Sequence, residues 1–143
     1  MKIGAIVPQG WVGEYDGWQP LDGWRRTTEV ARQADRLGFE SIWLFDHFHT
    51  VPKPTDEITF ESFTSLSALA ALTTRVRLGH IVICTAFRNP ALTAKMISTM
   101  DSISGGRKTS GSGPAGSATS GSATGTASRR PTSAWRGSVT TSR

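Results

Sequence analysis

The chain has 143 residues, and its net charge of +5 hides an uneven distribution of charge. All eleven acidic residues lie between Glu14 and Asp101, and residues 1–107 carry eleven lysines and arginines in total, so the excess positive charge belongs to residues 108–143. The single cysteine excludes an intramolecular disulfide and favours a reducing compartment. Because the sequence shows no secretory signal and no run of about 20 apolar residues, we expect a cytoplasmic protein without a membrane partner.

The predicted elements alternate between apolar runs and amphipathic segments. Apolar runs rich in β-branched residues occupy residues 2–7, 41–45 and 76–84, and their starts are 39 and 35 residues apart. Consecutive apolar residues of this kind are typical of strands that are buried on both faces. Between and after these runs, apolar residues recur with helical spacing in residues 23–39, 61–74 and 90–104.

Residues that suit helix ends mark the boundaries of these helices. Asp22 can cap the start of the first helix, and Gly38 suits a left-handed residue at its end. Asn89 followed by Pro90 begins the third helix, and Gly105 ends it. The resulting order β-α-β-α-β-α requires parallel crossovers, because antiparallel hairpins do not give this spacing. The sequence therefore predicts the fold class α/β with a parallel sheet.

Residues 108–143 do not continue this alternation. Serine, threonine, glycine and alanine make up 27 of these 36 residues, and Val139 is the one branched aliphatic residue among them. A fourth strand is due near residue 107, but the composition predicts none, because such a segment buries too little apolar surface to offset the entropy of ordering. We expect residues 108–143 to form a disordered tail.

The strongest candidate site is the run Asp46, His47, Phe48 and His49, directly after the second predicted strand. In parallel α/β folds the C-terminal ends of the strands face the active site. An aspartate and two histidines there can supply a general base, a proton relay or metal ligands, although this set is incomplete for a metal unless a further ligand joins it. A capped strand end with an ordinary loop histidine is the plainer alternative.

Two other features lie near the same edge of the predicted sheet. Cys84, at the end of the third predicted strand, is either a nucleophile or a buried structural cysteine, and the structural reading is favoured because nothing in the sequence marks a reactive thiolate. Trp11, Trp18 and Trp24 lie in or beside the long loop after the first strand. They either line an apolar substrate pocket or pack beneath that loop.

Three stretches of the sequence carry a resemblance to a known family: KIGAIVPQG, LGFESIWLFDHFHTVP and TTRVRLGHIVICTAFRNPALTAKMISTMDSISGGR. They resemble the bacterial luciferase-like monooxygenase family, and look closest to members that use the deazaflavin coenzyme F-420. The resemblance covers residues 1–107 and implies a TIM barrel of roughly 250 residues or more. The implied architecture is the N-terminal βα units of a TIM (β/α)8 barrel, incomplete in this chain.

The resemblance also implies roles for individual residues. His47 matches a second-strand histidine that serves some deazaflavin-dependent members as an active-site acid or base. Asp46 matches a position that approaches the cofactor. Ile81, Val82 and Cys84 match a segment that lines the deazaflavin, where the family often has a cis peptide bond that does not precede proline. The implied cofactor is F-420 with FMN as the alternative, the implied partner is a small-molecule substrate, and the full-length relative is expected to be a homo-oligomer.

The resemblance stops at Arg107, where the family continues with a fourth strand and a glycine-rich stretch. Residues 111–122 can be encoded by codons that translate as LGAGWKRDEWLG when the reading frame starts two bases later. The codons for residues 123–129 can continue that frame as YGYGFP, which completes the family's pattern. We therefore expect a frameshift in the gene or in its reading, with residues 108–143 out of frame.

The first hypothesis is thus a truncated luciferase-like oxidoreductase that is inactive as written. Its full-length relative would transfer a hydride between a reduced flavin or deazaflavin and an organic substrate, with or without oxygen as in a monooxygenase. A metal-dependent hydrolase on the same barrel, using His47 and His49, is one alternative. A small binding module with a basic tail is another, but the charges of that tail are sparse and Trp135 is its one aromatic residue, so we do not expect nucleic acid as a partner.

Overall fold

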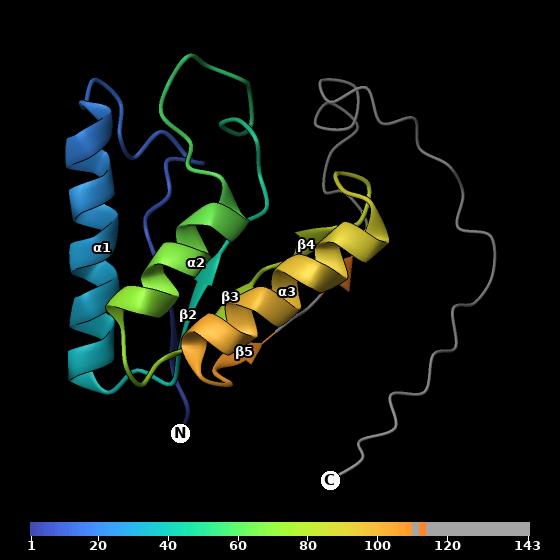
Figure 1. The fold of residues 1–143 in the computed structure, drawn as a ribbon. Helices are drawn as coiled ribbons and strands as arrows, with labels where there is room; N and C mark the ends of the chain where they lie inside the picture. Colours follow the sequence, from blue (N-terminus) through green and yellow to red (C-terminus); the bar gives the residue numbers. More distant parts are fainter. Residues whose placement is uncertain (110–111, 114–143) are drawn as a thin grey trace, which may run out of the picture.

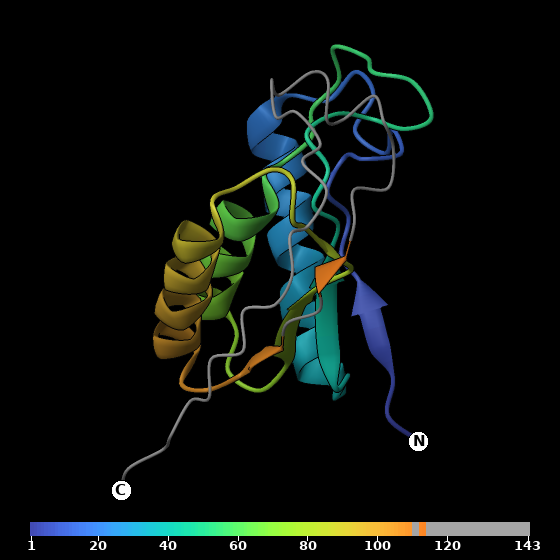
Figure 2. The ribbon, with the colours of Figure 1, turned by 90° about the vertical axis from the view of Figure 1, so that its right-hand side faces the viewer.

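A computed structural model describes residues 1–109 and 112–113, and these form a parallel sheet with helices on one face (Figures 1 and 2). The strand order is β1-β2-β3-β5, with every pair parallel, and β4 pairs with β6 in a second parallel ladder. The predicted α/β class is confirmed. The elements in chain order are β1 (Gly4–Ile6), α1 (Pro20–Leu37), β2 (Ser41–Leu44), α2 (Ser62–Leu72), β3 (Arg77–His80), β4 (Ile83–Cys84), α3 (Pro90–Ser104), β5 (Lys108–Thr109) and β6 (Ser112–Gly113).

The core lies between the sheet and the helices. Ile42 and Leu44 of β2 and Leu78 of β3 are completely buried there, together with Phe63 and Leu66 of α2. The register pairs Ile42 with Leu78, so their side chains leave the sheet on the same face. Burial of each such side chain contributes about 1.5–3 kcal/mol. Among the helices of residues 1–109, none is long and apolar enough to cross a membrane.

The opposite face of the sheet carries Trp43, whose indole lies over the neighbouring strand. A Cβ atom on Gly79 would lie only 2.2 Å from the Trp43 ring, so this close approach requires glycine. The indole Nε1 donates a hydrogen bond to the Ser41 hydroxyl (2.8 Å). Ile6, on the same face of β1, is 53% exposed. In a closed (β/α)8 barrel this face forms the packed interior.

The ends of α1 confirm one prediction and correct another. The helix begins at Pro20, with Gln19 as its N-cap, so the expectation that Asp22 caps it is wrong. Proline suits the first helical position because the N–H group that it lacks would have no partner within the helix. Asp22 lies in the first turn and pairs with Arg25 at 3.0 Å. Gly38 ends α1 with φ 84°, as predicted.

Side chains cap the other two helices. Glu61 precedes α2 and accepts hydrogen bonds from the backbone N–H groups of Phe63 (3.0 Å) and Thr64 (2.7 Å). Asn89 precedes α3 and accepts from the N–H of Ala91 (2.8 Å), which confirms the predicted start of that helix. These caps satisfy N–H groups that have no partner within the helix.

The third predicted strand is in fact two strands. β3 ends at His80 and β4 begins at Ile83, and the Ile81-Val82 peptide between them is cis. The expectation that no strand follows near residue 107 is also wrong, because β5 pairs with β3 and β6 pairs with β4. Backbone hydrogen bonds form these short ladders without the apolar signal that the prediction required. The rest of the expected disordered tail lies outside the described residues.

Two polar side chains hold the strands at their N-terminal ends. Asp35 of α1 accepts hydrogen bonds from the backbone N–H groups of Thr74, Arg75 and Val76 (2.8–2.9 Å). Burial raises the pKa of Asp35, but these hydrogen bonds outweigh it and hold the pKa below its ordinary value. Arg107 donates to five acceptor atoms in α2 and the residue that caps its C-terminus, in α3 and directly before β3. The chain is therefore closely fitted to the fold up to Arg107.

Candidate active site

Asp46 lies just beyond the C-terminal end of β2 and joins four segments of the chain. Its carboxylate oxygens accept hydrogen bonds from the Arg88 guanidinium (2.7 and 2.8 Å), the Ser62 hydroxyl (2.9 Å) and the Cys84 backbone N–H (2.9 Å). Its side chain is 1% exposed. Burial raises the pKa of Asp46, but the Arg88 guanidinium and the other hydrogen bonds outweigh it and hold the pKa below its ordinary value. Asp46 is therefore an ionised anchor whose oxygens are engaged within the protein.

Arg88 is the cation of this network. It also donates to the Glu61 carboxylate (2.6 Å), and its guanidinium carbon lies 4.5 Å from the centroid of the Phe63 ring. Burial lowers the pKa of Arg88, but Asp46 and Glu61 outweigh it and raise the pKa above its ordinary value. The sequence analysis did not single out Arg88, which directly precedes Asn89 and Pro90. Its pairing with Asp46 appears only when α2, β2 and the segment before α3 come together.

Residues 81–84 lie beside the end of β2. The Ile81 backbone N–H donates to the Leu44 carbonyl (2.9 Å). Ile81 and Val82 are 38% and 46% exposed, whereas Cys84 is buried and binds Asp46 through its backbone. Ile81 and Val82 therefore offer accessible apolar surface at the edge where the resemblance predicts a cofactor. The contacts of Asp46 and Cys84 with a cofactor stay predictions, and the geometry gives both residues a positioning role behind that surface.

His47 sits in a half-buried aromatic cluster. Its imidazole stacks on the Trp11 indole with ring centroids 5.4 Å apart and planes 9° apart, and the Phe45 ring lies 5.8 Å away. Burial lowers the pKa of His47, the charge of His49 lowers it further, and Asp46 opposes both more weakly. Within residues 1–109 no hydrogen bond engages the imidazole. The ring is thus neutral near pH 7, with its nitrogens available for proton exchange.

His49 does not share the position of His47. β2 ends at Leu44, before either histidine, and the His49 Nδ1 lies 2.9 Å from the Thr50 carbonyl oxygen. In the part of the chain that the structure describes, no three His, Cys, Asp or Glu side chains gather in a way that could hold a metal ion. The geometry therefore gives the hydrolase alternative no support.

Of the three tryptophans, Trp11 alone stacks on a predicted site residue. Trp18 packs against Tyr15, with ring centroids 5.5 Å apart, and Trp24 meets the Phe60 ring edge-on at 5.7 Å. For Trp18 and Trp24, packing beneath and beside the loop is thus the observed role.

Gln9, which the sequence analysis did not single out, fixes the neighbourhood of His47. Its side chain is completely buried. The amide Nε2 donates to the carbonyls of Phe45 (2.8 Å) and Phe60 (2.6 Å), and Oε1 accepts from the Phe45 N–H (2.9 Å). Gln9 therefore joins the ends of β1 and β2 to the start of α2. Its signal in the sequence is a polar residue directly after an apolar strand.

His80 is buried elsewhere, in the helix-facing core. Its ring packs on Phe63 with centroids 4.2 Å apart, and neither ring nitrogen has a hydrogen-bond partner among the described residues. Burial lowers the pKa of His80 from 6.5 to about 3, so the ring is neutral near pH 7. His80 is a core residue and not a member of the candidate site.

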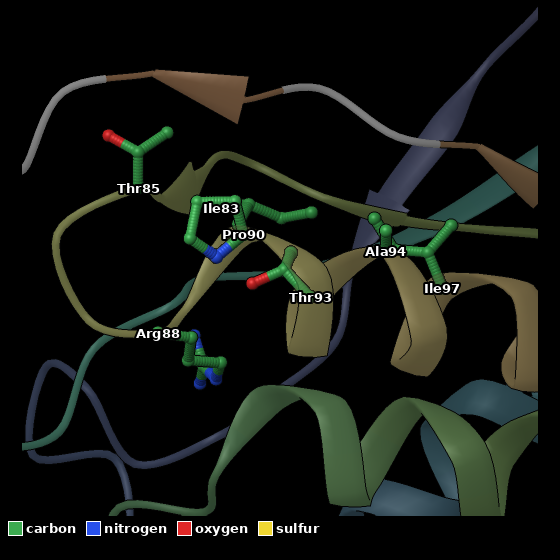
Figure 3. A pocket seen from close by; sticks show the side chains of 7 residues that line it. All are labelled: Ile83, Thr85, Arg88, Pro90, Thr93, Ala94 and Ile97. Atoms are coloured by element: carbon green, nitrogen blue, oxygen red, sulfur yellow. The ribbon is translucent and has the colours of Figure 1, made fainter. Parts of the chain in front are cut away.

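A cavity of about 310 Å³ lies between β4 and α3 (Figure 3). None of the predicted site residues lines it. Arg88 lines the cavity and also pairs with Asp46, so the cavity adjoins the Asp46 network. The lining residues are Ile83, Thr85, Arg88, Pro90, Thr93, Ala94 and Ile97.

The fold and the site together define a class of protein: the opening βα units of a parallel barrel enzyme, with a neutral histidine at the C-terminal edge of its sheet. The chain belongs to the luciferase-like monooxygenase family, whose model matches residues 1–136. This match confirms the resemblance and extends farther along the chain than the motifs that carried it. The members that resemble this chain are monooxygenases and reductases, so the family is one of oxidoreductases.

The chain is 33% identical to the pyrimidine monooxygenase RutA of Rhizobium rhizogenes over 112 residues, which cover 75% of this chain and 31% of that protein. It therefore spans about a third of the length of this curated relative. A coenzyme F420-dependent tetrahydromethanopterin reductase from Methanopyrus kandleri superposes with TM-score 0.63 and 25% identity, over 87% of this chain and 30% of that one. The oxygenating component of 3,6-diketocamphane monooxygenase from Pseudomonas putida, in complex with FMN, superposes with TM-score 0.72 over 87% of this chain and 32% of its own length; at 21% identity it shows the fold alone.

Proposed function

We propose that this chain is the N-terminal part of an oxidoreductase that transfers a hydride between a reduced deazaflavin or flavin and a small organic substrate. The observation that carries the proposal is the neutral, half-buried imidazole of His47 at the C-terminal edge of the sheet, the edge at which Ile81 and Val82 are also exposed. The family supports the reaction class. The chain alone, which spans about a third of its curated relatives, is proposed to be inactive.

The described residues fit the ring system of such a cofactor. Ile81 and Val82 present accessible apolar surface on which a flat ring can pack. Asp46 and the backbone of Cys84 would hold that surface in place from behind. We propose F-420 as the cofactor and FMN as the alternative, because the Methanopyrus kandleri reductase is F420-dependent and the Pseudomonas putida enzyme was solved with FMN. When bound, either cofactor would supply the hydride chemistry.

His47 would move the proton that accompanies hydride transfer. Its lowered pKa keeps the imidazole neutral near pH 7, so a ring nitrogen can accept a proton from a substrate hydroxyl. In the reverse direction the imidazolium would return that proton to the substrate oxygen. Substrate and cofactor thus meet His47 and Ile81 at one edge of the sheet.

Residue 108 supports the proposed frameshift. Lys108 is in register with Leu78, whose side chain faces the core, and only 9% of Lys108 is exposed. Burial lowers its pKa from 10.5 to about 8, and Asp101 opposes this more weakly. Strands that are covered by helices carry apolar residues at such positions. We infer that the native residue here is apolar and that the foreign sequence begins directly after Arg107.

Replacing Lys108 with leucine is expected to stabilise the chain. The lowered pKa means that burial of the ammonium opposes folding by on the order of 3 kcal/mol below pH 8. That cost falls as the pH rises from about 8 to 10.5, because in this window the unfolded chain binds more protons than the folded one. Urea unfolding at pH 7 should show a larger free energy of unfolding for the Lys108→Leu variant. Repeated between pH 8 and 10.5, it should show a flatter dependence on pH for this variant than for the unaltered chain. The matched control is Lys95→Leu on the exposed surface of α3, and an equal change in both variants would contradict the inference.

Cofactor binding tests the function itself. Resequencing of the gene around the codons for residues 106–111 comes first, and the corrected frame is then expressed. We expect the corrected protein to bind F-420 or FMN, measured by quenching of cofactor fluorescence, and the present chain to bind neither tightly. An unbroken frame in the gene would overturn the proposed frameshift. A corrected protein that binds zinc but neither cofactor would overturn the oxidoreductase proposal.

A further inference from the structure

Three aromatic rings from two loops meet at the candidate site. The Trp11 indole lies parallel to the His47 imidazole, with 9° between the planes, and the Phe45 ring lies 4.0 Å from Trp11 at an angle of 41°. All three side chains are half-buried. Trp11 therefore covers part of one face of the imidazole in an offset stack, and the imidazole cannot turn out of its plane without losing that contact.

The loop that carries Trp11 is held firmly against the rest of the site. The Trp11 carbonyl accepts a hydrogen bond from the Val51 N–H (2.8 Å). The preceding Gly10 has φ 95°, and a Cβ atom there would lie 1.8 Å from the Ile58 carbonyl oxygen. Only glycine permits this approach, because any side chain would collide with the backbone. Glu14 braces the same loop, accepting hydrogen bonds from three backbone N–H groups between residues 9 and 12.

We propose that Trp11 is a positioning residue for His47: by stacking, it fixes the plane of the imidazole and shields part of one of its faces from water. For catalysis this inference rests on the proposed acid–base role of His47. The charged groups around the imidazole are Asp46 and His49, both on the chain segment of His47 itself. Glu14, on the loop of Trp11, is engaged by backbone N–H groups. Removal of the indole thus changes the shielding of His47 without removing a charge.

The pKa of His47 in the purified chain is the test. The chain has three histidines, so a ¹³C-histidine NMR titration gives three signals, which His47→Gln and His49→Gln variants assign. In Trp11→Ala we expect the pKa of His47 to rise toward its ordinary value, because water reaches the uncovered ring. In Trp11→Phe an aromatic ring remains and the pKa should stay close to that of the unaltered chain. Trp18→Ala is the matched control, since Trp18 packs on Tyr15 and is 46% exposed.

An unchanged or lower pKa of His47 in Trp11→Ala would overturn the proposal, as would an equal rise in Trp18→Ala. A His80 signal that titrates with an ordinary pKa would show that Trp11→Ala does not fold. In that case the tryptophan fluorescence of the unaltered chain is the deciding measurement. Imidazolium quenches a stacked indole, so a fluorescence step at the pKa of His47 should be present, and should vanish in Trp11→Phe. The absence of that step overturns the proposal. Neither measurement needs cofactor or substrate. Failure of the proposal about Trp11 is therefore distinguishable from failure of the proposed function.

Discussion

In the frame-corrected enzyme, replacing His47 with alanine is expected to lower turnover by about 10²–10⁴-fold, which is the usual contribution of a positioned acid or base. Cofactor affinity should change little, because Ile81 and Val82 supply the proposed apolar contact. Assayed in the direction that oxidises a substrate hydroxyl, the unaltered enzyme should gain activity as the pH rises through the pKa of His47, since the neutral imidazole is the base in that direction. That pKa lies below its ordinary value because burial disfavours the charged ring.

His49→Ala is the matched control for this experiment. His49 is the other histidine of the same loop, and its Nδ1 contacts the neighbouring Thr50 carbonyl rather than a site residue. Its replacement should leave turnover within a few-fold of the unaltered enzyme. Steady-state kinetics and a cofactor titration on both variants separate loss of chemistry from loss of binding. Normal turnover in His47→Ala would show that the assigned role is wrong.

Replacing Arg88 with methionine is expected to destabilise the fold by about 3–5 kcal/mol, because it leaves the buried Asp46 carboxylate without its cation. The Asp46 and Arg88 side chains are only 1% and 10% exposed, so water cannot take over the role of the guanidinium. In the unaltered chain the lowered pKa of Asp46 contributes stability that is present above its unfolded pKa and is lost as the pH falls through the folded value. In Arg88→Met this contribution should disappear.

Urea unfolding of Arg88→Met beside Arg25→Met measures the effect. Arg25 pairs with Asp22 on the exposed surface of α1, where both side chains are more than half exposed. Its loss should cost less than about 1 kcal/mol. The double variant Arg88→Met with Asp46→Asn should recover part of the stability, because the most deeply buried carboxylate of the network is then uncharged. Equal losses in the two single variants would contradict a special role for the Asp46–Arg88 pair.

The sequence by itself determined the alternation of strands and helices as far as α3, and it indicated the family. Parallel strands beneath helices are encoded as consecutive apolar residues, and helix ends depend on local side chains such as Gly38 and Asn89, so both signals are read from neighbouring positions. The same local reading placed His47 directly after β2, and the structure puts it at the C-terminal edge of the sheet. The motifs named the luciferase-like family, which the family comparison confirms.

Local sequence patterns did not predict the features that depend on the backbone alone. β5 and β6 pair through main-chain hydrogen bonds at the edge of the sheet, and their residues carry no apolar signal. The break of the third strand at the Ile81-Val82 peptide was equally invisible in a continuous apolar run. The start of α1 was placed too late because Pro20, which begins it, lies before the first apolar residue of the helical pattern.

Only the tertiary structure decided which side chains form the site. Asp46 and Arg88 are 42 residues apart in sequence, and Gln9 and Phe45 are 36 apart, yet each pair makes hydrogen bonds in the folded chain. A carboxylate after a strand reads equally well as a cofactor contact or as a structural anchor. The choice depends on whether a buried cation from a distant segment reaches it, because a buried charge must find its partner inside the protein. The sequence lists the charged and polar groups, and the crossovers between parallel strands decide which of them meet.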